Sequence, residues 1–85
     1  MADHRASIGL DLGQEWRYHV TTRNGEPIDT SEGYTRKANA IRGVVLNRPE
    51  VGIIKVRNRK GRVVRTIVVT PRLRAKYARR YGARA

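Results

Sequence analysis

The sequence predicts an α+β fold in which helices cover an antiparallel sheet of four to five strands. Three observations carry this prediction. Apolar and polar residues alternate over several short stretches, with the two-residue period of strands. Asn24-Gly25 and Lys60-Gly61, whose glycines lie 36 residues apart, separate pairs of these stretches as hairpin turns do. Residues 38–45 instead carry apolar side chains at helical spacing, which predicts a helix packed on the sheet.

The first strands are expected between residues 8 and 31. Residues 1–7 are interpreted as a flexible start, and residues 8–12 alternate as a strand with one apolar face. Residues 16–20 place two aromatic side chains and a β-branched one on the same face. Asn24-Gly25 can supply the positive φ angles that a tight hairpin needs, so residues 28–31 should return alongside.

A helix is predicted over residues 36–47. Thr35 is the expected N-cap, and Pro49 should end the helix at or before Arg48. Gly43 costs roughly 1 kcal/mol relative to alanine inside a helix. We therefore expect close packing against the sheet at Gly43 to offset this cost.

The second half is interpreted as a repeat of the same unit. Residues 51–57 and 62–69 alternate as strands around a turn, and Thr70-Pro71 supplies an N-cap and a first helical residue for a basic helix over 71–81. The element order is therefore ββα followed by ββα. We expect one α+β domain over residues 8–70, with residues 71–85 forming a basic C-terminal helix and tail.

Residues 16–47 resemble the YegP-like family of small bacterial and phage proteins of unknown function. The shared pattern is carried by Asn24-Gly25-Glu26, Ile28, Ser31-Glu32-Gly33-Tyr34, Lys37-Ala38, Ala40 and Gly43-Val44. Arg36 stands where the family usually has a serine cap, which moves the capping role to Thr35. The resemblance implies ββα units, either repeated in one chain or paired as an intertwined homodimer, and it implies no activity.

Positive charge is concentrated in the second part of the chain. The net charge of the whole chain is +12, but residues 1–35 carry three arginines and six acids, whereas residues 36–85 carry sixteen cations and one acid, Glu50. Such an asymmetry is typical of proteins that bind nucleic acid or another anionic surface.

The candidate contacts with a phosphate backbone fall in two groups. The turn of the second hairpin and its flanks carry five of them, Lys55, Arg57, Arg59, Lys60 and Arg62. The last helix carries five more around a stripe of Leu73, Tyr77 and Tyr81, namely Arg72, Arg74, Lys76, Arg79 and Arg80. Loop-tip and helix cations of this kind can reach phosphate oxygens.

The sequence favours a protein that is not an enzyme. It has no cysteine, and His4, His19 and the scattered acids show neither catalytic nor metal-ligand spacing, so no metal or other cofactor is predicted. No apolar run approaches the ~18 residues that would span a membrane, and the start does not read as a signal peptide. We therefore expect a soluble cytoplasmic protein.

The function expected from these observations is non-enzymatic binding to the phosphate backbone of DNA or RNA, by a protein that could be phage-encoded. The alternative is a protein-interaction module that docks on an acidic surface of a host protein. Arg65 stands between Val63 and Ile67 on an otherwise apolar strand face, so it should meet a carboxylate, a partner chain, solvent or a ligand. Strands with apolar residues on both faces also suggest that a homodimer covers both sides of the sheet.

Overall fold

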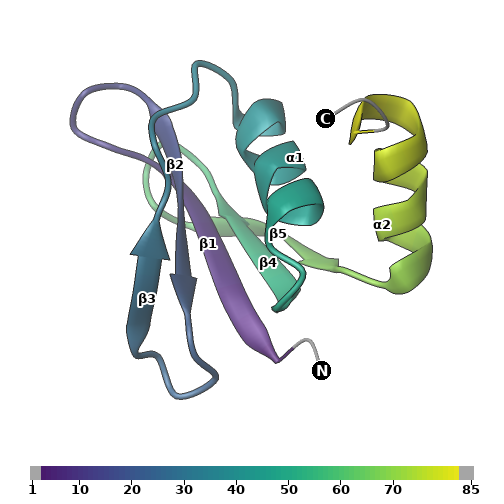
Figure 1. Cartoon of the computed structure of the whole chain (residues 1–85). Helices are drawn as coiled ribbons and strands as arrows, with labels where there is room; N and C mark the ends of the chain where they lie inside the picture. The colour runs from purple at the N-terminus through teal and green to yellow at the C-terminus, as the bar shows by residue number, and fades with distance from the viewer. Residues whose placement is uncertain (1–2, 83–85) are drawn as a thin grey trace.

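A computed structural model describes residues 3–82. Five strands and two helices follow one another along the chain (Figure 1). The strands are β1 (His4–Leu10), β2 (Trp16–Thr21), β3 (Pro27–Thr30), β4 (Val51–Arg57) and β5 (Val63–Val68). The helices are α1 (Lys37–Asn47) and α2 (Pro71–Tyr77), and a π-helical turn, η1 (Ala78–Gly82), continues α2. The predicted α+β class is confirmed, with five strands where four to five were expected, and with two helices.

The sheet is mixed, with strand order β3-β2-β1-β4-β5. The predicted antiparallel pairing holds for β1–β2, β2–β3 and β4–β5, but β1 and β4 at the centre are parallel. This happens because α1 carries the chain from β3 back across the sheet, so that β4 runs in the same direction as β1. The predicted ββα-ββα order holds only from β2 onward, since β1 precedes the first unit.

β1 begins at His4, so residues 4–7 belong to the sheet rather than to a flexible start. Their inclusion is explained by Ala6, which is buried in the core opposite Val20 on one side and Ile54 on the other. Residues 1–2 and 83–85, which the sequence assigned to a flexible start and a basic tail, lie outside the described residues.

The core lies between α1 and one face of the sheet. Ile8, Val20, Ile54 and Val56 from the strands meet the apolar side chains of α1, and all are almost completely buried. Within residues 3–82, no helix covers the opposite face (Figure 1). Among residues 3–82, no helix is long and apolar enough to cross a membrane.

The start of α1 differs from the prediction. Arg36, not Thr35, is the N-cap, and no side chain caps the helix there. The buried stripe is also rotated, because Ala40 and Gly43 face the sheet while Ala38 is exposed. The predicted close packing at Gly43 is confirmed, since a Cβ there would lie 2.7 Å from the Tyr34 hydroxyl. The helix ends at Asn47, ahead of Pro49, as predicted.

Candidate nucleic-acid interface

Nine of the ten predicted contact residues form two groups at opposite ends of β5, and the tenth, Lys55 in β4, pairs with Thr66 near the middle of β5. The hairpin between β4 and β5 holds one group, and α2 with η1 holds the other, because α2 follows the far end of β5 (Figure 1). Six extended residues separate them, a distance of about 20 Å at roughly 3.3 Å per residue. The structure therefore does not gather the ten residues into one patch.

The hairpin presents its cations on a well-defined turn. Gly61 adopts a φ of 85°, and its N–H donates to the carbonyl of Asn58 at 3.0 Å. The Asn58 side-chain oxygen accepts the backbone N–H groups of Lys60 at 2.9 Å and Arg62 at 3.1 Å. These bonds fix the backbone of the tip, so that the exposed side chains of Arg59, Lys60 and Arg62 point to solvent.

Arg57 is committed to the fold of this hairpin. Its Nε donates to the Ser7 hydroxyl at 3.0 Å, and its Nη1 donates to the Gly61 carbonyl at 2.9 Å. It is half-buried, whereas Lys55, also in β4, is exposed. Arg57 is therefore less available to a ligand than its sequence position suggests.

The second group stands on a helix that begins as the sequence predicts. The Thr70 hydroxyl accepts the N–H of Leu73 at 3.1 Å, and Pro71 occupies the first turn. Thr70 thus satisfies one of the donors that a helix start leaves unpaired. Leu73 and Tyr77 are half-buried, and the exposed cations of this group are Arg72, Lys76, Arg79 and Arg80.

Arg74 does not face solvent with them, because it holds α2 against the end of α1. Its Nη1 donates to the Val45 carbonyl at 2.7 Å, and its Nη2 donates to the carbonyls of Arg48 at 3.0 Å, Pro49 at 3.2 Å and Val51 at 2.5 Å. Burial lowers the pKa of Arg74 from its ordinary value, and Glu50 acts in the opposite direction. Arginine nevertheless stays charged at neutral pH, so Arg74 also complements the negative end of the α1 dipole.

None of the exposed cations in the two groups is neutralised by an acid within residues 3–82. The ion pairs there use His4, Arg17 and Arg48 as cations. Glu50, the one acid after residue 35, lies 3.3 Å from Arg48, which also pairs with Asp29. Eight predicted contacts, at positions 55, 59, 60, 62, 72, 76, 79 and 80, are therefore exposed and have no ion pair with the described part of the chain.

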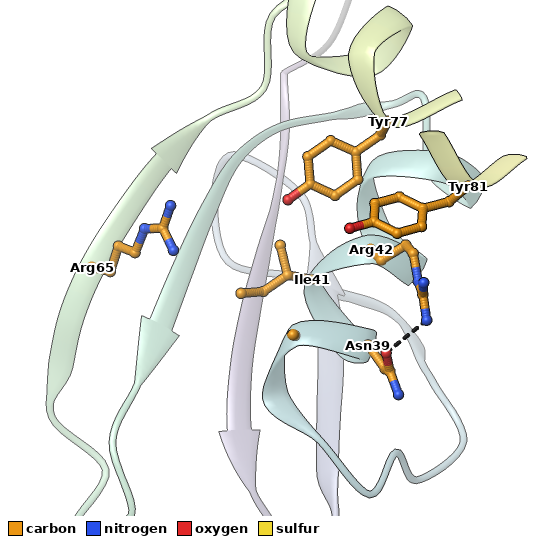
Figure 2. Close-up of a pocket in the computed structure, with 7 residues that line it drawn as sticks. Asn39, Ile41, Arg42, Arg65, Tyr77 and Tyr81 are labelled. Carbon is orange, nitrogen blue, oxygen red and sulfur yellow. Dashed lines mark hydrogen bonds between the residues drawn. The ribbon is translucent and has the colours of Figure 1, made fainter. Parts of the chain in front are cut away.

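A cleft between α1, β5 and the α2–η1 segment was not predicted. It has a volume of about 150 Å³ and is lined by Ala38, Asn39, Ile41, Arg42, Arg65, Tyr77 and Tyr81 (Figure 2). The sequence singled out Arg65 as a charge on an otherwise apolar strand face and placed Tyr77 and Tyr81 on the apolar stripe of the last helix. The sequence gave no sign that Asn39 and Arg42 belong to a site, because they line the cleft only through the way α2 packs against α1.

The family signature has structural roles. The Ser31 hydroxyl accepts the N–H of Tyr18 at 3.0 Å and donates to the Glu32 carbonyl at 2.8 Å. Tyr34 exchanges two backbone hydrogen bonds with Trp16 and so extends the pairing beyond β3. Burial, together with Tyr18 and Glu32, raises the pKa of Tyr34. No group of three or more metal-ligating side chains occurs within residues 3–82.

Comparison with known proteins bears on the first of the two units. No curated protein and no solved structure matches the chain. Residues 11–46 match the profile of a family described as a domain of unknown function, DUF1508. This is the YegP-like domain family, so the resemblance seen in the sequence is confirmed over that segment, which spans β2, β3 and most of α1.

Proposed function

We propose that this protein binds the phosphate backbone of DNA or RNA without acting as an enzyme. The observation that carries the proposal is that eight cations of the two predicted groups are exposed, and none of them has an ion pair within residues 3–82. A surface built for solubility alone would intersperse both signs of charge. Here the single acid of this region is already paired with Arg48, so positive potential is left for an external anion.

Placing the two groups about 20 Å apart suits a polymer rather than a small anion. A nucleic acid can contact the hairpin at one end and α2–η1 at the other, whereas a single phosphate can reach only one of them. Contacts of this kind position a protein on the backbone and read little sequence. Arg74 and Arg57 take no part as primary contacts, because their guanidinium groups already donate to protein atoms.

The test is the salt dependence of binding to a duplex of mixed sequence. Each neutralised phosphate contributes a slope of about −0.9 to a plot of log affinity against log salt. The hairpin variant R59Q/K60Q/R62Q and the helix variant R72Q/R79Q/R80Q should each flatten the slope by up to about 2.7. R5Q/R23Q/R36Q removes the same charge from exposed positions outside both groups, and we expect its slope to stay much closer to that of the unmodified protein.

Two outcomes would overturn the proposal. One is that neither duplex DNA nor RNA is retained at about 50 mM salt, where phosphate contacts are strong. The other is that the control triple variant flattens the slope as much as the hairpin and helix variants, since that would make binding a matter of net charge alone. If one acidic host protein is captured, and remains bound after nuclease treatment, the result would favour the protein-interaction module instead.

The edge strand β5 supports a second proposal, that the chain forms a homodimer. Val64 and Val68 are 56% and 63% exposed on the sheet face away from α1, and one edge of β5 is unpaired. Exposed apolar edges of this kind are usually covered. Light scattering over a dilution series should show a mass well above the 9.7 kDa of one chain, and V64T/V68T should shift it toward 9.7 kDa. A mass that stays at 9.7 kDa at high concentration would contradict the proposal.

A further inference from the structure

Arg65 is an exposed charged residue on the face of β5 that is otherwise directed toward the core. It projects from the face of β5 that carries Ile67 toward the core, and it makes no ion pair and donates no side-chain hydrogen bond among residues 3–82. Figure 2 shows its guanidinium directed into the cleft between β5 and α1. Because the Arg65 side chain is exposed, its guanidinium stays hydrated and its charge needs no partner within the protein. Its donors are therefore available to an anion that enters the cleft.

The other polar groups of the cleft are suited to an anion. Arg42 comes from α1, where its Nη2 donates to the Asn39 side-chain oxygen at 2.7 Å and its guanidinium lies 4.5 Å from the centre of the Tyr81 ring. The Asn39 amide nitrogen remains free to donate, since its oxygen accepts from Arg42. The hydroxyls of Tyr77 and Tyr81 point into the cleft (Figure 2). Among residues 3–82, no carboxylate lines the cleft.

The rim adds further positive charge. Arg80 lies 5.4 Å from the centre of the Tyr81 ring, and Lys76 borders a smaller hollow against the same two tyrosines. A different hollow of about 230 Å³ lies near the start of the chain, but Asp3 lines it together with Arg5 and Arg23. The cleft at Arg65 is thus the better anion site of the two.

The size of the cleft limits what it can hold. Sites that enclose a whole small molecule measure roughly 300–1,000 Å³, and this cleft measures about 150 Å³. It can accept one phosphate-sized group while the rest of the ligand stays outside. Arginine forks match the oxygens of such a group with two parallel hydrogen bonds, and tyrosine hydroxyls and amides donate to the remaining oxygens.

We propose that the cleft is a phosphate subsite, with Arg65 as its main charged ligand and Arg42, Asn39, Tyr77 and Tyr81 as the surrounding donors. The proposal deepens the proposed function and, for its link to nucleic acid, rests on it. Arg65 lies midway along β5 between the hairpin and helix cations, so a phosphate held there would join the two groups along one backbone. The subsite can nevertheless be tested apart from nucleic acid.

The first experiment is a titration of the full chain with inorganic phosphate, followed by NMR of arginine Nε–H and asparagine side-chain signals. Phosphate should shift the signals of Arg65, Arg42 and Asn39 and leave those of Arg23 and Arg36 in place. R65Q should weaken phosphate binding by at least about tenfold, as expected for losing hydrogen bonds to a charged group. R65K keeps the positive charge but loses the paired N–H donors of the guanidinium, so it should weaken phosphate binding by a smaller factor. R36Q serves as the matched control, because Arg36 is also exposed.

The second experiment separates a backbone phosphate from a free or terminal one. If the cleft holds a backbone phosphate, R65Q should flatten the salt slope for duplex DNA without terminal phosphates by about 0.9, and R36Q should leave it unchanged. If it prefers a terminal or free phosphate, the slope stays and a 5′-phosphorylated oligonucleotide competes better than its hydroxyl-ended counterpart. Either result supports the subsite and shows which kind of phosphate it holds.

The outcomes also separate this inference from the proposed function. DNA binding that depends on the hairpin and helix cations, with no phosphate shifts at Arg65 and no effect of R65Q, would overturn the subsite alone. Phosphate shifts at Arg65 in a protein that ignores DNA and RNA would overturn the proposed function alone. Folding of each variant is checked by Trp16 fluorescence. Trp16 is buried in the core and belongs to β2, which β1 and β4 separate from β5.

Discussion

The Tyr34 hydroxyl occupies the space that a side chain at Gly43 would need. An ideal Cβ on Gly43 would lie 2.7 Å from that oxygen and 3.2 Å from the adjoining ring carbon. An Ala substitution inside a helix normally gains about 1 kcal/mol over glycine, whereas overpacking costs about 1–3 kcal/mol. We therefore expect G43A to be neutral or to lower the free energy of unfolding by up to about 2 kcal/mol.

A double-mutant cycle tests this contact directly. Y34F removes the hydroxyl, so G43A should be better tolerated in the Y34F background by at least about 0.5 kcal/mol, the usual size of coupling between residues in contact. Urea unfolding followed by Trp16 fluorescence measures the four proteins. Purely additive effects would show that the hydroxyl is not what excludes a side chain at Gly43.

Replacing Arg74 should affect stability rather than nucleic-acid affinity. Its four bonds to carbonyls join α2 to α1 and to the start of β4, and hydrogen bonds to charged groups contribute about 1.5–3 kcal/mol. We expect R74Q to lower the free energy of unfolding by about this amount, as measured by urea denaturation. R72Q is the matched control, since Arg72 is exposed two residues away and should change stability by less than about 0.5 kcal/mol. Equal effects of the two changes would contradict the role given to Arg74.

Asp11 should make stability depend on pH in the acidic range. The Glu15 backbone N–H donates to its carboxylate at 2.9 Å and Arg17 Nε donates at 2.5 Å, and these two bonds, in that order, lower the pKa of Asp11 from its ordinary value of 3.8. A lowered pKa in the folded state contributes stability above pH 3.8, and this contribution is lost as the pH falls through the folded value.

D11N should therefore be less stable than the unmodified protein at neutral pH, and the difference should shrink as the pH falls below 3.8. Urea unfolding at a series of pH values checks this. E26Q, which changes an exposed acid without an ion pair among residues 3–82, is the control. If D11N lowered the free energy of unfolding by the same amount at every pH, the cause would be altered packing of the loop rather than the charge of Asp11.

Gly25 and Gly61 should respond alike to substitution, because they have the same role in the two hairpins. Their φ angles are 90° and 85°, and each N–H donates to the carbonyl three residues earlier. A Cβ would meet nothing within 4 Å at either position, so the cost of alanine lies in the backbone alone, at about 1–2 kcal/mol. Asparagine tolerates positive φ better and should cost less. Thermal unfolding of G25A, G61A, G25N and G61N checks this, and a neutral G61A would contradict it.

Residue patterns were sufficient to predict elements that depend on nearby residues. Alternation located the strands, the two glycines located the hairpins, and Thr70-Pro71 located the start of α2. At Asn24-Gly25 only Gly25 takes a positive φ, so the turn closes differently from the tight two-residue form expected. The N-cap prediction at Thr35 failed because the chain enters α1 at Arg36 without using a side-chain acceptor.

The features that the sequence did not reveal depend on contacts between distant residues. Alternation shows which face a strand residue occupies but not which strand lies beside it, so the parallel pairing of β1 with β4 could not be seen. Charge alone likewise does not distinguish Arg74 from Arg72. The end of α1 needs donors for its last carbonyls, but only the packing of α2 shows that Arg74 supplies one. The cleft at Arg65 was missed for the same reason.

The central position of β1 has a consequence for how the chain must fold. β2 and β3 can pair as soon as residue 30 has been made, and β4 and β5 form their own hairpin, but these two pieces share no strand contact without β1. The pairing of His4 with Val51 spans more than half of the chain, and closing so long a loop slows folding. Joining β1 to β4 is therefore expected to limit the folding rate. A mutation at Ala6 or Ile54 should slow refolding, whereas one at Gly25 should mainly speed unfolding.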